Sequence, residues 1–184
     1  MWKVISQEQI GQLAREHSVI TIVVARSMNS EFIRWLYDSW KEIHRIAGAQ
    51  WHIVIPSCSG EWVYSRDAVP QDFNTELSLE IANSYGVSRS EFPCLIMEDF
   101  CEDAIPIRIS IPDGDRARAK FVDDFAELAR SVRDDEFEHG DWRARRSINS
   151  SIANSLSQKK LASLGVKLLP KAIGALARFG IQHS

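Results

Sequence analysis

The sequence predicts an α/β domain with a mixed sheet flanked by helices, followed by a basic amphipathic helical segment at the C-terminus. Two apolar runs, Val19–Ala25 (VITIVVA) and Trp51–Pro56 (WHIVIP), have the length and composition of strands buried on both faces of a sheet. Between them, apolar residues recur at helical spacing from Ile33 to Ala47. Two buried strands joined by a helix form a β-α-β unit, so we expect these strands to be parallel.

The other elements of the domain follow from local signals of the same kind. An S-x-x-Q pattern from Ser6 to Gln9 is typical of a helix start, and Gly86 stands where a second helical period ends. Residues 57–74 carry Pro, Gly, Ser and Asp and are expected to be a loop. The remaining expected elements are a strand at Met1–Ile5, a helix at Thr75–Tyr85, strands at Cys94–Met97 and Ala104–Ile111, and a helix over about 117–134.

Charge is distributed unevenly along the chain. Residues 1–142 contain all 25 acidic residues and only 14 Lys and Arg, which gives this part a formal charge of −11. Residues 143–184 contain eight Lys and Arg and no acidic residue. This asymmetry indicates a C-terminal segment with a partner of its own, either an anionic surface or the acidic body of the chain. The sequence therefore divides into a domain (1–135), a polar hinge (136–158) and a basic helical segment (159–184).

The helical interpretation of residues 159–184 depends on the spacing of their charges. Four cations are separated by seven, four and seven residues, which places them on one helical face, and leucines fall on another. Pro170 is expected to kink or divide this helix. The residues expected to make its contacts are Lys160, Leu164, Lys167, Leu168, Lys171, Ile173, Leu176, Arg178 and Phe179.

Three kinds of partner suit such a segment. Amphipathic helices pack against protein more often than against lipid, so a protein partner or self-association is the first expectation, with docking on the acidic body of the same chain ranked beside it. An anionic membrane surface is the alternative, because cationic amphipathic helices bind such surfaces. Nucleic acid is the weakest expectation, because phosphates would use the charge and leave the apolar face without a role.

A specific family resemblance lies in Ile81–Asp99 (IANSYGVSRSEFPCLIMED). Here a helix ending in Tyr-Gly-Val leads through a short arm to a proline and an apolar strand. Together with the order of the expected elements, this stretch resembles the thioredoxin-like superfamily over roughly residues 1–135. The resemblance implies a cis peptide bond before Pro93. It also implies a binding rim formed by Ser27, Ser30, Phe92, Pro93 and Cys94.

The chain departs from this family where the redox motif would lie. The turn before the long helix reads Ser27-Met28-Asn29-Ser30, and no cysteine precedes Cys58. A serine hydroxyl cannot form a disulfide, so thiol–disulfide exchange is not available at this turn. We therefore expect a protein that is not an enzyme. A thiol enzyme using Cys94 is the least favoured alternative, because no local cation would lower the pKa of that thiol.

No cofactor or metal is expected. The five histidines lack the spacing of metal ligands, and the chain has no phosphate-binding glycine loop. Three cysteines without a CxxC pair favour a reducing, cytoplasmic setting. Trp35 and Trp62 are candidates for an exposed aromatic patch. The sequence thus predicts a redox-inactive, thioredoxin-like binding or scaffold module whose C-terminal helix mediates protein contact or oligomerisation.

Overall fold

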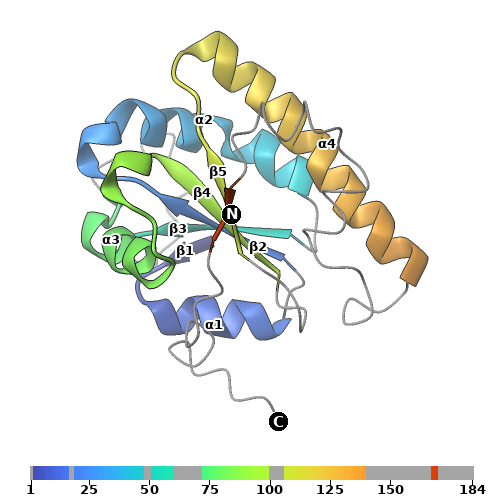
Figure 1. Cartoon of the computed structure of the whole chain (residues 1–184), viewed down its shortest axis with the longest axis horizontal. Helices are drawn as coiled ribbons and strands as arrows, with labels where there is room; N and C mark the ends of the chain where they lie inside the picture. Colours follow the sequence, from blue (N-terminus) through green and yellow to red (C-terminus); the bar gives the residue numbers. More distant parts are fainter. Residues whose placement is uncertain are drawn as a thin grey trace.

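A computed structural model of the chain describes residues 2–16, 19–47, 51–59, 72–99, 106–139 and 167–169 (Figure 1). Within these residues, six strands form one sheet in the order β1-β3-β2-β4-β5-β6. The strands are β1 (Trp2–Val4), β2 (Val19–Val24), β3 (Trp51–Pro56), β4 (Cys94–Asp99), β5 (Ile107–Ser110) and β6 (Lys167–Leu168). The helices are α1 (Gln7–Glu16), α2 (Ser30–Ala47), α3 (Thr75–Ser84) and α4 (Asp115–His139), with 3-10 turns η1 (Ser27–Asn29) and η3 (Arg89–Glu91).

The sheet is mixed, as the sequence predicts. Strands β1 and β2 both pair with β3 in parallel, which confirms the β-α-β unit. Strand β4 pairs with β2 in antiparallel orientation, and β5 pairs with β4 in the same way. The parallel and antiparallel halves of the sheet therefore meet between β2 and β4. The register of this central pair places Val24 opposite Cys94.

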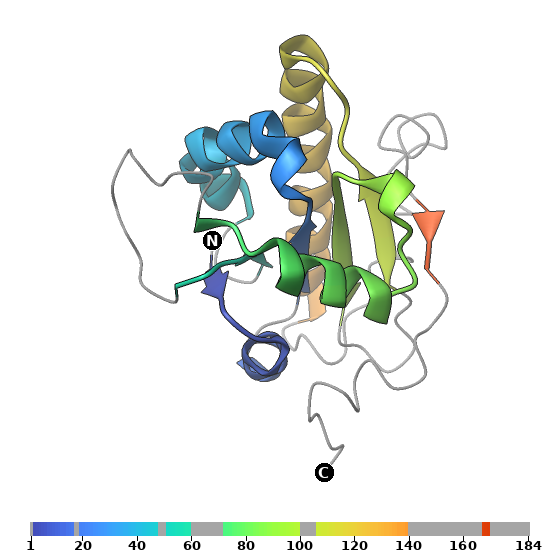
Figure 2. The same ribbon diagram turned by 90° about the vertical axis from the view of Figure 1, so that its left-hand side faces the viewer.

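Helices cover both faces of the sheet, which explains why β2 shows no alternation of polar and apolar residues. Figures 1 and 2 show α2 and α4 on one face and α1 and α3 on the other. Val23 packs into the core on the α2 and α4 side, whereas Ile22 and Val24 pack into the core on the α1 and α3 side. Both faces of the strand are therefore buried, and apolar residues are favoured at every position.

Helix α3 shows how local signals set its bounds. The side chain of Asn74 accepts a hydrogen bond from the Leu77 amide at 3.0 Å, which caps the first turn. At the other end, Gly86 adopts a φ of 66°, a conformation that glycine reaches without steric cost. The helix therefore ends where the sequence indicates, and the chain turns toward η3 and β4.

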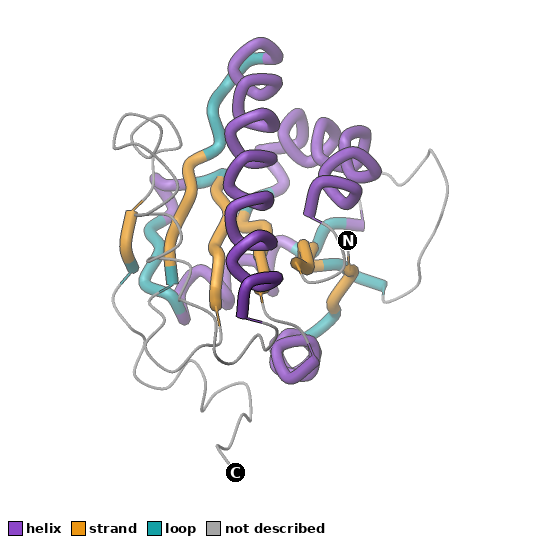
Figure 3. Tube along the Cα trace, turned by 90° about the vertical axis from the view of Figure 1, so that its right-hand side faces the viewer, coloured by secondary structure: helices purple, strands orange, loops and turns teal. Residues whose placement is uncertain are grey.

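Helix α4 extends further than its periodicity predicts. It runs from Asp115 to His139, so its last turn enters the segment expected as a polar hinge. Figure 3 shows it lying along the sheet beside the strands. Near its start the buried Arg118 donates to Glu31 of α2 at 2.8 Å and lies over the ring of Trp35, 5.9 Å from the ring centroid.

Trp35 does not form an exposed patch. Its side chain is half-buried and packs against the core beside Phe32, with ring centroids 5.9 Å apart. Arg118 from α4 covers part of the ring, a contact that helix periodicity within α2 alone does not reveal. Trp62, the other residue of the expected patch, lies outside the described residues.

The C-terminal segment differs from the expected helix at the positions that the structure describes. Lys167 and Leu168 form strand β6 on the edge of β5, where Leu168 pairs with Ile107 and Lys167 with Arg108. Pairing with the edge of β5 favours the extended backbone of Lys167 and Leu168, and Pro170 disfavours helical backbone at Leu169, the residue before it. The next residue, Leu169, is buried in the core on the α1 and α3 side, and its amide bonds to the Pro106 carbonyl at 2.9 Å.

The observed architecture is compatible with the thioredoxin-like fold that the sequence resembles. The peptide bond between Phe92 and Pro93 is cis, as that resemblance implies. In the part of the chain that the structure describes, no helix is long and apolar enough to cross a membrane.

Candidate functional site

The candidate site is a rim at the end of β2, where the chain leaves the sheet to begin α2. Because Val24 pairs with Cys94 in the antiparallel register, the residues that follow Val24 run beside those that precede Cys94. Arg26 and Phe92 meet in this way, with the guanidinium carbon 5.8 Å from the ring centroid. A cation at this distance over an aromatic face is attracted by the ring.

Turn η1 gives the rim its shape. The Asn29 amide donates to the Arg26 carbonyl at 2.8 Å, and the Arg26 amide donates to the Asn29 side-chain oxygen at 2.9 Å. These reciprocal bonds fix the turn so that its middle residue projects into solvent. Met28 is 72% exposed, which makes it the most exposed of the large apolar side chains among the described residues. An exposed methionine is flexible and polarisable, and it suits a contact with varied apolar partners.

Arg26 also offers an unused hydrogen-bond donor. Its Nε atom is buried and forms no hydrogen bond with any described residue. Buried polar groups are almost always satisfied, so this donor is available to a water molecule or to an acceptor of a partner. A carbonyl oxygen at the rim would satisfy it.

Cys94 opens β4 directly beneath this rim. Its side chain is fully buried, and burial raises the pKa of the thiol to about 12, with a smaller upward effect from Glu91 and an opposing effect from Arg108. Near neutral pH this cysteine is a protonated, enclosed group, and the thiolate needed for nucleophilic chemistry is scarce. Its position serves packing.

The register of β2 and β4 places the turn that carries Ser27 and Ser30 at the same end of the sheet as Phe92, Pro93 and Cys94. Ser27 and Ser30 are exposed at η1 and at the start of α2, while Phe92 and Pro93 are half-buried on the facing strand arm. Sequence reasoning missed Arg26 and Met28, which supply the donor and the apolar contact. The local sequence around Arg26 and Met28 is that of an ordinary turn. Only the pairing of β2 with β4 shows that this turn lies near Phe92.

The residues expected to make contact in the C-terminal segment are only partly placed. Lys167 and Leu168 lie in β6, and their side chains are not described. The others lie outside the described residues: Lys160, Leu164, Lys171, Ile173, Leu176, Arg178 and Phe179.

A second polar cluster lies at the carboxyl ends of β1 and β3. The nearly buried ammonium of Lys3 is ion-paired with Asp72, and the Ser59 hydroxyl donates to the same carboxylate at 3.2 Å. Burial alone would raise the pKa of Asp72, but the hydrogen bonds from Lys3 and Ser57 and the charge of Lys3 outweigh it and lower that pKa. The cluster joins the end of β3 to the start of α3, since the Asn74 amide bonds to the Pro56 carbonyl at 3.1 Å.

Two further groups border this cluster. The thiol of Cys58 is exposed. The hydroxyl of Tyr37 is buried and forms no hydrogen bond with a described residue, and burial raises its pKa to about 12, with added effects of Asp72 and Cys58. Neither group has a base or an acid placed to activate it within the described part of the chain, so the cluster is a structural tie.

A metal centre is not formed by the described residues, among which no three His, Cys, Asp or Glu side chains are grouped to hold an ion. Comparisons with protein-family models, curated proteins and solved structures find no match to the chain. What the protein does is therefore inferred from its own residues.

Proposed function

We propose that the protein is a non-catalytic, thioredoxin-like binding module that takes up an extended segment of a partner protein at the rim of Arg26, Met28 and Phe92. The observation that carries this proposal is the exposure of Met28 in the turn that begins at Arg26, whose Nε donor forms no hydrogen bond with a described residue. An apolar anchor next to a single donor matches a peptide, which presents side chains and carbonyl oxygens in alternation.

The chemistry of the rim supports binding without catalysis. Ser27 and Ser30 stand in the positions of the exchanging thiols that the family resemblance implies. Cys94, the nearest thiol in sequence to the cis proline, is enclosed and has a pKa of about 12. A partner segment held here would meet no reactive sulfur, so the complex would dissociate unchanged.

A binding titration tests this proposal. The probe is reduced, carbamidomethylated insulin B chain, an unstructured peptide with apolar and polar residues, added to the ¹⁵N-labelled protein. Amide shifts should move saturably at Met28, Asn29, Ser30 and Phe92. Met28→Glu should weaken binding by about tenfold or more, because burying such an apolar side chain contributes about 1.5–3 kcal/mol.

Ile5→Glu is the matched control, since Ile5 is also an exposed large apolar residue, 48% exposed, but lies at the end of β1. It should leave the affinity unchanged. Shifts confined to other surfaces, or equal losses in the two variants, would contradict the proposal.

We further propose that the basic C-terminal segment makes a second contact, with protein in preference to anionic lipid. Leu169 supports this preference, because the one side chain of that segment that the structure describes packs against protein. Sedimentation velocity of the full chain, with and without phosphatidylserine vesicles, distinguishes contact with protein from contact with lipid. Co-sedimentation with vesicles at moderate salt would favour lipid instead.

A further inference from the structure

The charge of Arg26 at the rim has no counter-ion among the described residues. Its side chain is half-buried and forms no ion pair with any of them. The more deeply enclosed arginines of the neighbouring elements are paired. Arg108, 12% exposed, contacts Glu91 at 3.2 Å, and Arg118, 4% exposed, contacts Glu31 at 2.8 Å. A charge that is partly removed from water is costly unless an opposite charge lies beside it.

The groups that Arg26 does meet leave its charge uncompensated. The face of the Phe92 ring attracts the guanidinium but carries no net charge. A carbonyl oxygen of a partner would satisfy the buried Nε donor and would still supply no counter-ion. A carboxylate would supply an acceptor and an opposite charge together. The planar guanidinium also matches a carboxylate through two parallel hydrogen bonds, which makes this pairing specific.

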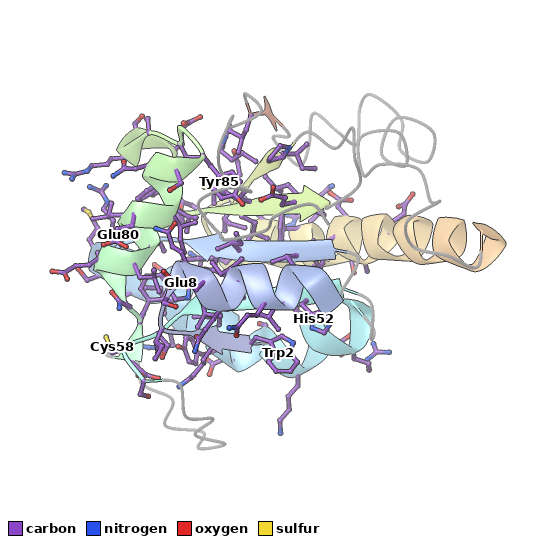
Figure 4. All side chains as sticks on the ribbon, turned by 90° about the horizontal axis from the view of Figure 1, so that it is seen from below. Trp2, Glu8, His52, Cys58, Glu80 and Tyr85 are labelled. Atoms are coloured by element: carbon purple, nitrogen blue, oxygen red, sulfur yellow. The ribbon has the colours of Figure 1, made fainter. Side chains whose placement is uncertain are left out.

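The net charge of the domain opposes an acidic partner at long range. Residues 1–142 carry a formal charge of −11, and Figure 4 shows two of the exposed carboxylates, Glu8 on α1 and Glu80 on α3. Attraction of a carboxylate to Arg26 therefore depends on direct contact. Salt screens such a partly buried contact less than it screens repulsion between exposed charges. A preference for an acidic partner should accordingly persist when the salt concentration is raised.

We propose that the rim is selective for a partner segment in which a carboxylate lies close to a large apolar side chain, the carboxylate on Arg26 and the apolar side chain on Met28. Met28 is 72% exposed and follows Arg26 by two positions, so the two contacts are expected from nearby positions of the partner. This inference rests on the proposed binding function of the rim and names the chemical class of its partner.

Two N-acetylated, C-amidated peptides test the inference: Gly-Ser-Leu-Glu-Leu-Phe-Gly-Ser and its analogue with Gln in place of Glu. Each is titrated into the ¹⁵N-labelled full chain near neutral pH and at moderate salt, and the amide shifts of Met28 and Phe92 give the dissociation constant. The Glu peptide should bind about three- to tenfold more tightly, as expected for a half-buried ion pair. A third peptide, the Gln sequence ending at Phe with a free carboxyl group, distinguishes a side-chain carboxylate from a chain terminus.

Arg26→Gln should bind the Glu and Gln peptides equally, because the variant has no charge to pair with the carboxylate. Arg45→Gln is the matched control, since it makes the same change of charge at an exposed position near the other end of α2. This control should keep the preference for Glu. Arg26→Lys, which retains the charge but not the two parallel hydrogen bonds, should show a smaller preference. Circular dichroism checks that each variant is folded, and the comparison of peptides on the unaltered chain requires no variant.

Three results would overturn the inference. Equal affinities of the two peptides for the unaltered chain, with shifts at the rim, contradict the selectivity and leave the proposed function intact. The absence of saturable shifts at the rim with every peptide contradicts both. A preference for Glu that persists in Arg26→Gln places the carboxylate on another cation, such as those of the basic C-terminal segment.

Discussion

Ser78 of α3 is hydrogen-bonded to both backbone groups of Ala25, the residue that follows β2. Its hydroxyl accepts from the Ala25 amide at 3.0 Å and donates to the Ala25 carbonyl at 2.9 Å. Both residues are fully buried. The Ser78 hydroxyl thus makes the two hydrogen bonds that the backbone of a neighbouring strand would otherwise make. These bonds hold Ala25 in place and so fix the direction in which Arg26 leaves the sheet.

Ser78→Ala should destabilise the fold by about 1–3 kcal/mol, because it leaves buried backbone groups without partners. Urea unfolding followed by circular dichroism measures the change. Ser84→Ala is the control, since the Ser84 hydroxyl bonds only to an exposed turn of the same helix, to the Glu80 carbonyl at 3.0 Å. Alanine favours helix more than serine does, so equal effects of the two variants would show that the hydrogen bonds to Ala25 contribute no more than the exposed bond of Ser84.

The sequence predicts those parts of the fold that local patterns control. The run from Val19 to Ala25 is apolar except at Thr21, because both faces of β2 are covered. A helix capped at one end and closed by Gly86 at the other is visible as a period of 3.6 residues. The cis bond before Pro93 follows from the family resemblance. Each of these features depends on neighbours in sequence or on one recognisable motif.

The parts that the sequence does not predict depend on contacts between distant residues. Arg26 meets Phe92 only because β2 pairs with β4 in one register. Trp35 is covered by Arg118, which lies more than eighty positions away. Lys167 and Leu168 belong to the segment expected as a helix but form a strand, because the edge of β5 offers hydrogen bonds.

Cys58 and Cys94 should differ sharply in reactivity. Cys58 is exposed, whereas Cys94 is buried and has a pKa of about 12. At pH 8 a maleimide should therefore label Cys58 within minutes and leave Cys94 unmodified in the folded protein, because the thiolate is the reacting species. Peptide mass spectrometry after brief labelling measures both sites in one sample.

Labelling in urea is the control, since unfolding should make both cysteines react at similar rates. Rapid labelling of Cys94 in the native state would support the thiol-enzyme alternative. Insulin disulfide reduction should be absent in parallel, because Ser27 and Ser30 cannot exchange disulfides.

Leu169 should contribute more to stability than Leu164, although a continuous helix would place both residues in similar surroundings. Leu169 is buried in the core on the α1 and α3 side. Leu169→Ala should therefore cost about 2–5 kcal/mol, as other buried leucines do. Leu164→Ala is the comparison variant: it changes the apolar face of the helix expected from sequence, and it should cost less stability than Leu169→Ala. Thermal unfolding of both variants measures the difference. A neutral Leu169→Ala would contradict the docking of β6.

Tyr37 should make stability depend on pH in the alkaline range. Burial, with help from Asp72 and Cys58, raises the pKa of Tyr37 to about 12 in the folded protein, above the value of about 10 for an exposed tyrosine. Between these two values the unfolded chain loses a proton that the folded chain retains. Ionisation therefore favours unfolding, and the stabilising effect of the neutral phenol, complete below pH 10, is lost as the pH rises toward 12.

Tyr37→Phe removes this titration and also removes a buried hydroxyl that forms no hydrogen bond with a described residue. The variant should be as stable as the unaltered chain or slightly more stable at pH 7, since an unsatisfied buried group is costly. It should lose less stability than the unaltered chain between pH 10 and pH 12, as measured by urea unfolding at each pH. The phenolate absorbance difference between the two proteins should rise near pH 12 and stay flat near pH 10. A rise centred near pH 10 would show that Tyr37 is open to solvent and that its hydroxyl is not enclosed between α2 and the Asp72 cluster.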